Sequence, residues 1–457
     1  MRSWIPLAAV LLLSCAGFSI AQPVAPPNTN ARFCADDSYA SVDGCLEAPI
    51  GGNFQMPDFY SRAAQSDQKF VTRPPWKVYG IDYPGGIPAA AFPLKDPTSA
   101  PLPKGCNFTG TNVVCSGAND PTFDGWDFGN TKSGCVRLLF NGNVTGTIRI
   151  KNFQHKNGDK CDVKNGDLID VGNGSTANLV LENVVLDGDG GNHPYNLPAL
   201  IMNNSTGCTV MRRVVFLHLP ARGFQTNSTC SPDVKYFYLE GLSYALAVQA
   251  SEGAGAGSDA LKLSSVPAFV TGNQPIMNAD NPDAFPVVTS TKGKDGATIG
   301  LNKKITGDGV RAGDRILFSP QIHAEFSLTD TRGGTAPTIQ YDYGTFYQPV
   351  TANGLATTAL LYISNGTPKP HFEKVYIGHS SFISNQMFNR RNGVAYLATV
   401  LAQIDEITWD SNYFSPHGSF GCFNYGGATV GSKNYKNNIN LLDGSQVDDT
   451  HCSGRSR

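Results

Sequence analysis

Residues 185–193, "VLDGDGGNH", place two carboxylates, three glycines, an amide and an imidazole within nine positions. Asp187 and Asp189 offer the hard oxygen atoms that Ca²⁺ prefers, and Asn192 could complete such a site. Two carboxyl groups could equally act as the acid and the base of glycosidic bond cleavage. Aspartate and glycine also tolerate tight backbone angles, so a solvent-facing turn explains the same residues. The sequence leaves these three interpretations open.

Polar residues recur at corresponding places in the neighbouring segments. Nine positions after Ile148, Leu179 and Thr209 come Asn157, Gly188 and His218. If the segments stack, one edge gathers carboxylates, imidazoles and cations, with His218 or Arg222 as a base or as the partner of a substrate carboxylate. The predicted catalytic residues are Asp187, Asp189, His218 and Arg222, the predicted substrate contacts are His155, Lys156, His193 and His417, and the predicted Ca²⁺ ligands are Asp187, Asp189 and Asn192.

The elements that would position these residues are short strands in a repeat. Ile148, Leu179 and Thr209 are separated by 31 and 30 residues, and Val375 and Ile407 by 32. Apolar residues alternate within each run, as in a strand with one buried face. A recurring unit of this length predicts a solenoid. Asn152 and Asn183 occupy the same place in adjacent units, which predicts an asparagine ladder at a bend.

This repeat resembles that of the right-handed parallel β-helix proteins, the architecture of pectate-lyase-like and polygalacturonase-like enzymes, phage tailspikes and adhesins. The resemblance covers roughly residues 113–264 and 358–445 and implies an all-β fold. The polygalacturonase elements "RIK" (Arg149–Lys151) and "HG" (His417 and Gly418) occur here in the reverse order. The catalytic residues of that family are therefore not transferred.

The chain divides into five segments by composition and pattern. These are a signal peptide (1–21), an extended capping segment (22–112), the first part of the β-helix (113–264), an insertion or β subdomain (265–357), and the last coils with a C-terminal cap (358–457). The apolar run and small residues near Ala21 predict secretion or periplasmic export. Alternatively, "LLSC" could make Cys15 a lipid anchor.

Ten cysteines remain if Cys15 is removed, which predicts disulfides in an exported chain. Cys106 and Cys115 flank a turn centred on glycine, so these two are expected to pair. The Cys34–Cys45 and Cys422–Cys452 regions are expected to help cover the two ends of the repeat.

The balance of 35 basic against 37 acidic residues argues against nucleic acid as a partner. No stretch after the N-terminus is apolar enough to span a membrane. We therefore expect a polysaccharide partner, processed by lyase or hydrolase chemistry, with a non-catalytic glycan-binding or adhesive protein as the alternative. Tyr341, Tyr343 and Tyr347 could stack on sugar rings or belong to the core.

Overall fold

The structure is a computed structural model, and almost all of its described residues belong to strands or to turns between them. It describes residues 31–33, 39–41, 74, 86–134, 136–156, 168–172, 175–187, 198–203, 207–219, 222–228, 230, 232–241, 246–266, 274–278, 280–281, 288–292, 297–318, 325–330, 334–348, 356–363, 370–384, 393–415 and 421–452. Within these ranges there is no α-helix, and a 3₁₀ turn, η2, covers Ala89–Ala91. The all-β class is therefore confirmed.

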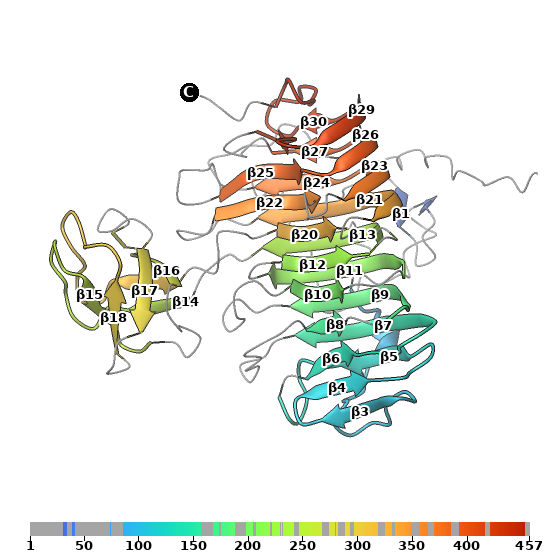
Figure 1. Ribbon diagram of the computed structural model, residues 1–457, viewed down its shortest axis with the longest axis horizontal. Helices are drawn as coiled ribbons and strands as arrows, with labels where there is room; N and C mark the ends of the chain where they lie inside the picture. The colour runs from blue at the N-terminus through green and yellow to red at the C-terminus, as the bar shows by residue number, and fades with distance from the viewer. Residues whose placement is uncertain are drawn as a thin grey trace, which may run out of the picture.

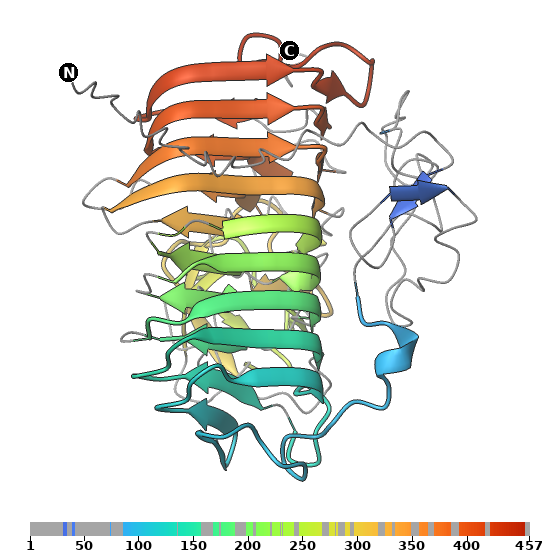
Figure 2. The same cartoon turned by 90° about the vertical axis from the view of Figure 1, so that its right-hand side faces the viewer.

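Two large sheets face each other across a shared apolar core (Figures 1 and 2). The ten-stranded sheet contains, in chain order, β3 (Cys106–Thr109), β4 (Asn112–Cys115), β6 (Arg137–Phe140), β8 (Ile169–Val171), β10 (Pro198–Asn203), β12 (Arg222–Asn227), β20 (Glu325–Asp330), β22 (Ala356–Ile363), β25 (Gly393–Val400) and β28 (Phe423–Asn424). Apart from the antiparallel β3–β4 hairpin, its strands are parallel.

The twelve-stranded sheet is parallel throughout. Its main path contains β5 (Thr122–Asp127), β7 (Thr147–Lys156), β9 (Asn178–Asp187), β11 (Thr209–Leu219), β13 (Pro232–Gly241), β21 (Thr335–Gln348), β23 (His371–Gly378), β26 (Gln403–Asp410) and β29 (Thr429–Lys436). Beside it lie β24 (Ser381–Ser384), β27 (Tyr413–Phe414) and β30 (Ile439–Asn440).

From β4 to β13, and again from β20 to β23, successive strands alternate between the two sheets. Each pair of strands thus stacks on the pair before it. The predicted register is confirmed, because Ile148 pairs with Leu179 and Leu179 with Thr209, while Val375 pairs with Ile407.

One bend column runs along the twelve-stranded sheet, and every residue in it has a positive φ. Its members, in register from β5 to β29, are Gly125, Asn152, Asn183, Arg213, Tyr236, Tyr343, His379, Ser411 and Asn437. The predicted asparagine ladder is confirmed here, because Asn183 Nδ2 donates to Asn152 Oδ1 at 3.0 Å. Each strand bends at this left-handed residue. The alternation of inward- and outward-facing side chains is reversed beyond it.

The insertion forms a separate six-stranded antiparallel sheet, drawn to one side in Figure 1. Its order is β14 (Leu246–Gln249), β19 (Arg315–Phe318), β16 (Gln274–Asn278), β17 (Val288–Lys292), β18 (Thr298–Leu301) and β15 (Ala260–Lys262). A bridge between Ala250 and Leu263 joins the two outer strands, so the sheet closes on itself around its own core. The insertion thus lies within about 246–318 rather than the expected 265–357, since β20 and β21 belong to the parallel sheets.

Disulfides lie near both ends of the stack and in its middle, and the N-terminal segment packs on one outer side. Cys34 and Cys45, which were expected to help cover one end, are outside the described residues. The predicted Cys106–Cys115 disulfide is confirmed in the β3–β4 hairpin, and further disulfides link Cys208 with Cys230 and Cys422 with Cys452. Ile87 and Leu94 of the N-terminal segment pack in an apolar cluster with Val185 and Val215, which follow the bend column on the outer face of the twelve-stranded sheet. Among the described residues no helix has the length and apolarity needed to cross a membrane.

Candidate active site

A second column of side chains lies one residue before the bend column and faces away from the core. This outer column contains, from β5 to β29, Asp124, Lys151, Glu182, Arg212, Lys235, Asp342, Gly378, Asp410 and Lys436. Its orientation follows from strand alternation, because the preceding residues Tyr341, Ile377 and Trp409 are wholly buried in the core. Every member except Gly378 carries a formal charge at neutral pH.

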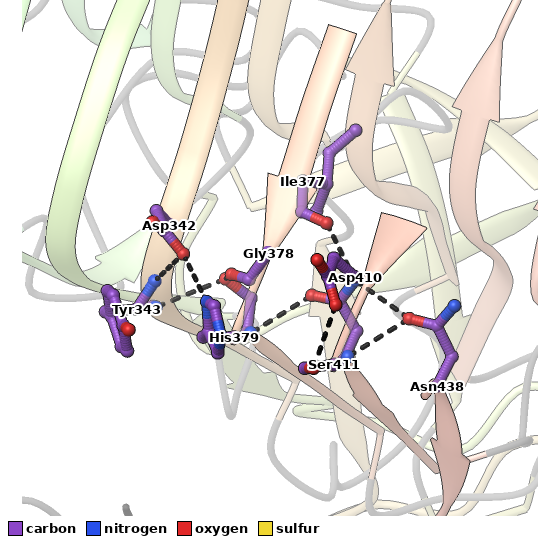
Figure 3. A network of polar contacts seen from close by, with 11 residues as sticks. Asp342, Tyr343, Ile377, Gly378, His379, Asp410, Ser411 and Asn438 are labelled. Carbon is purple, nitrogen blue, oxygen red and sulfur yellow. Dashed lines mark hydrogen bonds and ion pairs between the residues drawn. The ribbon is translucent and has the colours of Figure 1, made fainter. Parts of the chain in front are cut away.

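Two carboxylates flank the glycine of this column. Asp342 pairs in register with Gly378, and Gly378 pairs with Asp410 on the next strand (Figure 3). Neighbouring strands lie about 4.8 Å apart, so the backbones carrying the two carboxylates are separated by about 9.6 Å. Glycine has no side chain, so the outer column has a gap between the two aspartates.

The Tyr376 hydroxyl lies in this gap. A Cβ atom placed on Gly378 would collide with Tyr376 Oη and with the adjacent ring carbons, so the phenol lies directly over the glycine. Burial raises the pKa of the Tyr376 hydroxyl far above its ordinary value, and the carboxylates of Asp342 and Asp410 raise it further. Tyr376 therefore stays neutral and can donate a hydrogen bond between the two carboxyl groups.

Asp342 is held through one of its two oxygens. The backbone N–H of Tyr343 donates to Asp342 Oδ1 at 3.1 Å, and His379 Nδ1 lies 2.9 Å from the same oxygen. Within the described part of the chain Oδ2 has no hydrogen-bond partner, so it remains available to an incoming water or sugar hydroxyl. Asp342 is 8% exposed, which leaves little room for alternative orientations.

Asp410 is half-buried and less constrained. Ser411 Oγ donates to Asp410 Oδ1 at 2.9 Å. The next charges along the outer column are cations, because Lys235 pairs in register with Asp342 and Lys436 pairs with Asp410. Neither lysine forms an ion pair with another described residue, so both amines can interact with an acidic ligand.

The residues predicted from sequence lie elsewhere. Asp187 ends β9, is 4% exposed, and pairs in register with Lys156 and Leu217. His155 is wholly buried, with Nε2 3.1 Å from the Val136 carbonyl oxygen, so it contacts no solvent in this conformation.

His218 lies on β11 and Arg222 begins β12, and only their backbones are described. Asp189, Asn192, His193 and His417 are outside the described residues. Within the described ranges no group of three or more His, Cys, Asp or Glu residues is arranged to hold a metal ion. The expected Ca²⁺ site, which includes Asp189 and Asn192, stays a prediction.

A pocket of about 450 Å³ lies at the opposite end of the molecule, beside β5. It is six strand steps from Gly378, or about 29 Å. Its polar groups are largely engaged with the protein: Lys95 Nζ donates to the Asp124 carbonyl oxygen and lies over the Trp126 ring, and Asp120 accepts from two N–H donors. We therefore locate the candidate site at Gly378, where carboxyl oxygens remain available.

Sequence reasoning missed Asp342, Tyr376 and Asp410. The signal that could have identified them is the bend position itself, since "YDYG", "IGHS" and "WDSN" place Asp342, Gly378 and Asp410 one residue before it, as Lys151 and Glu182 are placed before Asn152 and Asn183. The stretch "YDYGTFY" was assigned to the insertion, and its Tyr341 proves to be a core residue bonded to Ser327 and Thr329.

No known protein family matches this chain, and no curated protein shows significant similarity to it.

Proposed function

We propose that the protein is an exported right-handed parallel β-helix enzyme that hydrolyses a polysaccharide, with Asp342 and Asp410 as its catalytic carboxyl groups. The observation that carries this proposal is the pair of carboxylates on either side of Gly378, with the neutral Tyr376 hydroxyl between them. The strand alternation between two parallel sheets supports the β-helix, and crossovers between parallel strands are almost always right-handed. Three disulfides between described cysteines support export.

The separation of the carboxylates favours inversion. Inverting glycosidases hold their carboxyl groups about 6.5–9.5 Å apart to admit a water, whereas retaining enzymes hold them about 5–5.5 Å apart. Two strand spacings, about 9.6 Å between backbones, lie near the upper end of the wider arrangement and well above the narrower one. A covalent sugar intermediate on either aspartate would need a closer pair.

The hydrogen bonds support a different role for each carboxyl group. Asp342, which already accepts two hydrogen bonds at Oδ1, acts as the general base and takes a proton from water through Oδ2. The water oxygen bonds to the anomeric carbon while the glycosidic C–O bond breaks. Protonated Asp410 gives its proton to the departing sugar oxygen. Asp342 ends protonated and Asp410 ionised, and exchange with solvent restores both.

The charges around the pair favour an acidic polysaccharide. Lys235 and Lys436 flank the two aspartates in the outer column, one strand spacing beyond each. Carboxylate groups on the sugars before and after the cleaved bond would meet these amines. Lyase chemistry is less well supported, because Tyr376 stays protonated and is therefore a poor base for proton abstraction.

The proposal is tested with purified protein and a panel of acidic and neutral polysaccharides, by measuring new reducing ends and, separately, the ultraviolet absorbance of unsaturated lyase products. Asp342→Asn and Asp410→Asn should each lower the hydrolysis rate by about a hundredfold or more. Asp405→Asn is the matched control, because Asp405 is an exposed carboxylate on the same strand, β26, and should leave the rate unchanged. Polymer binding without cleavage would instead support the adhesive alternative.

A further inference from the structure

Three consecutive members of the bend column carry bulky rings. Tyr236, Tyr343 and His379 have φ values of 58°, 52° and 42°. The left-handed region costs an ordinary side chain about 1–2 kcal/mol per residue, which is why glycine and asparagine are usual there. The first coils use Gly125, Asn152 and Asn183 instead. Strained residues that persist in a fold are concentrated at functional sites.

The rings form one buried stack that ends beside Asp342. Tyr236 stacks on Tyr343 with centroids 5.7 Å apart, and Tyr343 stacks on His379 at 4.4 Å with the ring planes 7° from parallel. All three residues are at most 6% exposed. The imidazole is therefore fixed in plane by the phenol below it and has little freedom to rotate.

The fixed imidazole determines how Asp342 is oriented. The carboxylate oxygen can only accept, so His379 carries its proton on Nδ1 and donates to Asp342 Oδ1 at 2.9 Å. With Oδ1 occupied, Oδ2 is the carboxylate oxygen that has no hydrogen-bond partner among the described residues. Asp342 lies on β21 and His379 directly follows the adjacent strand β23, so this bond links two neighbouring layers of the stack.

We infer that His379 is a positioning residue for Asp342, and that the Tyr236–Tyr343–His379 stack is maintained against backbone strain in order to hold it. This inference rests on the proposed function, in which Asp342 is the general base. His379 itself does not contact the reacting atoms. Its loss should therefore change the rate of the chemical step more than the binding of the polymer.

The chain allows a matched pair of variants to test this. In His379→Asn the amide nitrogen occupies the place of Nδ1, and asparagine tolerates the left-handed backbone. In His379→Gln the amide reaches the place of Nε2, so the donor to Asp342 is lost. We expect His379→Gln to lower kcat by about a hundredfold with KM unchanged, and His379→Asn to stay within about fivefold of wild type. The melting temperature of His379→Asn should equal or exceed that of the wild type.

A second measurement does not depend on activity. The imidazole Nδ1–H of His379 should give a slowly exchanging resonance in ¹⁵N-histidine-labelled protein, and Asp342→Ala should abolish it. Absence of that resonance in the wild type, or full activity in His379→Gln, would overturn the inference. These results are separable from failure of the proposed function, because active Asp342→Asn and Asp410→Asn variants would reject the hydrolase itself whatever the histidine variants do.

Discussion

Asp342 and Asp410 occupy the same register position on β21 and β26, the two strands that flank Gly378 on β23. The residues are 68 positions apart in the sequence, yet stacking brings them within two strand spacings. Because both face outward from a rigid parallel sheet, their separation is set by backbone hydrogen bonds rather than by loops. Such a scaffold keeps a catalytic pair in place without needing the substrate to order it.

Gly378 should be intolerant of even one added methyl group. In Gly378→Ala the new Cβ meets Tyr376, so the phenol must leave the gap between the carboxylates. We expect stability to fall by about 1–3 kcal/mol, as in other overpacked sites, and the hydrolysis rate to fall at least tenfold. In a Tyr376→Ala background, the added methyl group should cost little further stability in urea unfolding, and the rate should stay low. A stable and fully active Gly378→Ala would contradict the placement of Tyr376.

The asparagine ladder should contribute to stability through both its hydrogen bonds and its backbone. Asn183 donates to Asn152 at 3.0 Å and accepts from Arg213 Nε at 2.8 Å. Asn183→Gly loses these two bonds and should cost about 2 kcal/mol. Asn183→Ala should cost about 1 kcal/mol more, because alanine resists the left-handed conformation. If denaturant titrations gave the same free energy of unfolding for the wild type and Asn183→Gly, the ladder would make no measurable contribution to stability.

The buried Tyr341 should make stability fall in strong alkali. Burial raises its pKa to about 12, while an unfolded tyrosine ionises near pH 10. Its contribution is therefore complete below pH 10 and is lost as the pH rises through 12, by about 3 kcal/mol in total. Tyr341→Phe should be less stable at neutral pH, since Ser327 and Thr329 lose their hydrogen-bond partner. The variant should, however, lack the loss of stability between pH 10 and 12 that comes from Tyr341. If the free energy of unfolding fell equally in the two proteins above pH 10, this prediction would be contradicted.

The six-stranded insertion should be removable. Its buried residues form their own cluster, and β12 pairs directly with β20 and β13 with β21 across the insertion. Replacing residues 246–318 by a short flexible linker should leave a single cooperative melt within a few degrees of the full chain. A broad or strongly lowered transition would mean that the parallel sheets need the insertion to fold.

The repeat was predictable because its signals are local. Alternating apolar residues and the recurring asparagines predict the register of β7, β9 and β11. The interior position of His155 was not predicted, because the left-handed Asn152 reverses the alternation and turns Phe153 and His155 inward.

The candidate site was harder to predict because β21 lacks the asparagine that marks the bend in β7 and β9. At β21 the bend residue is Tyr343 rather than asparagine, and an insertion separates it from β13. The sequence pattern therefore places this stretch in the insertion, where it gives Asp342 no register with Gly378 and Asp410. Only the hydrogen-bonded register reveals that these three residues are neighbours.

The stereochemistry of the product tests the central claim most directly. The protein is incubated in an NMR tube with a polysaccharide from the panel that yields new reducing ends, and the anomeric proton of the new end is recorded before mutarotation. A pair of carboxylates two strands apart predicts that the first product has the inverted configuration, and that Asp342→Asn and Asp410→Asn form almost none of it. A first product that retains the configuration of the substrate, or undiminished product from either variant, would contradict the assignment of Asp342 and Asp410.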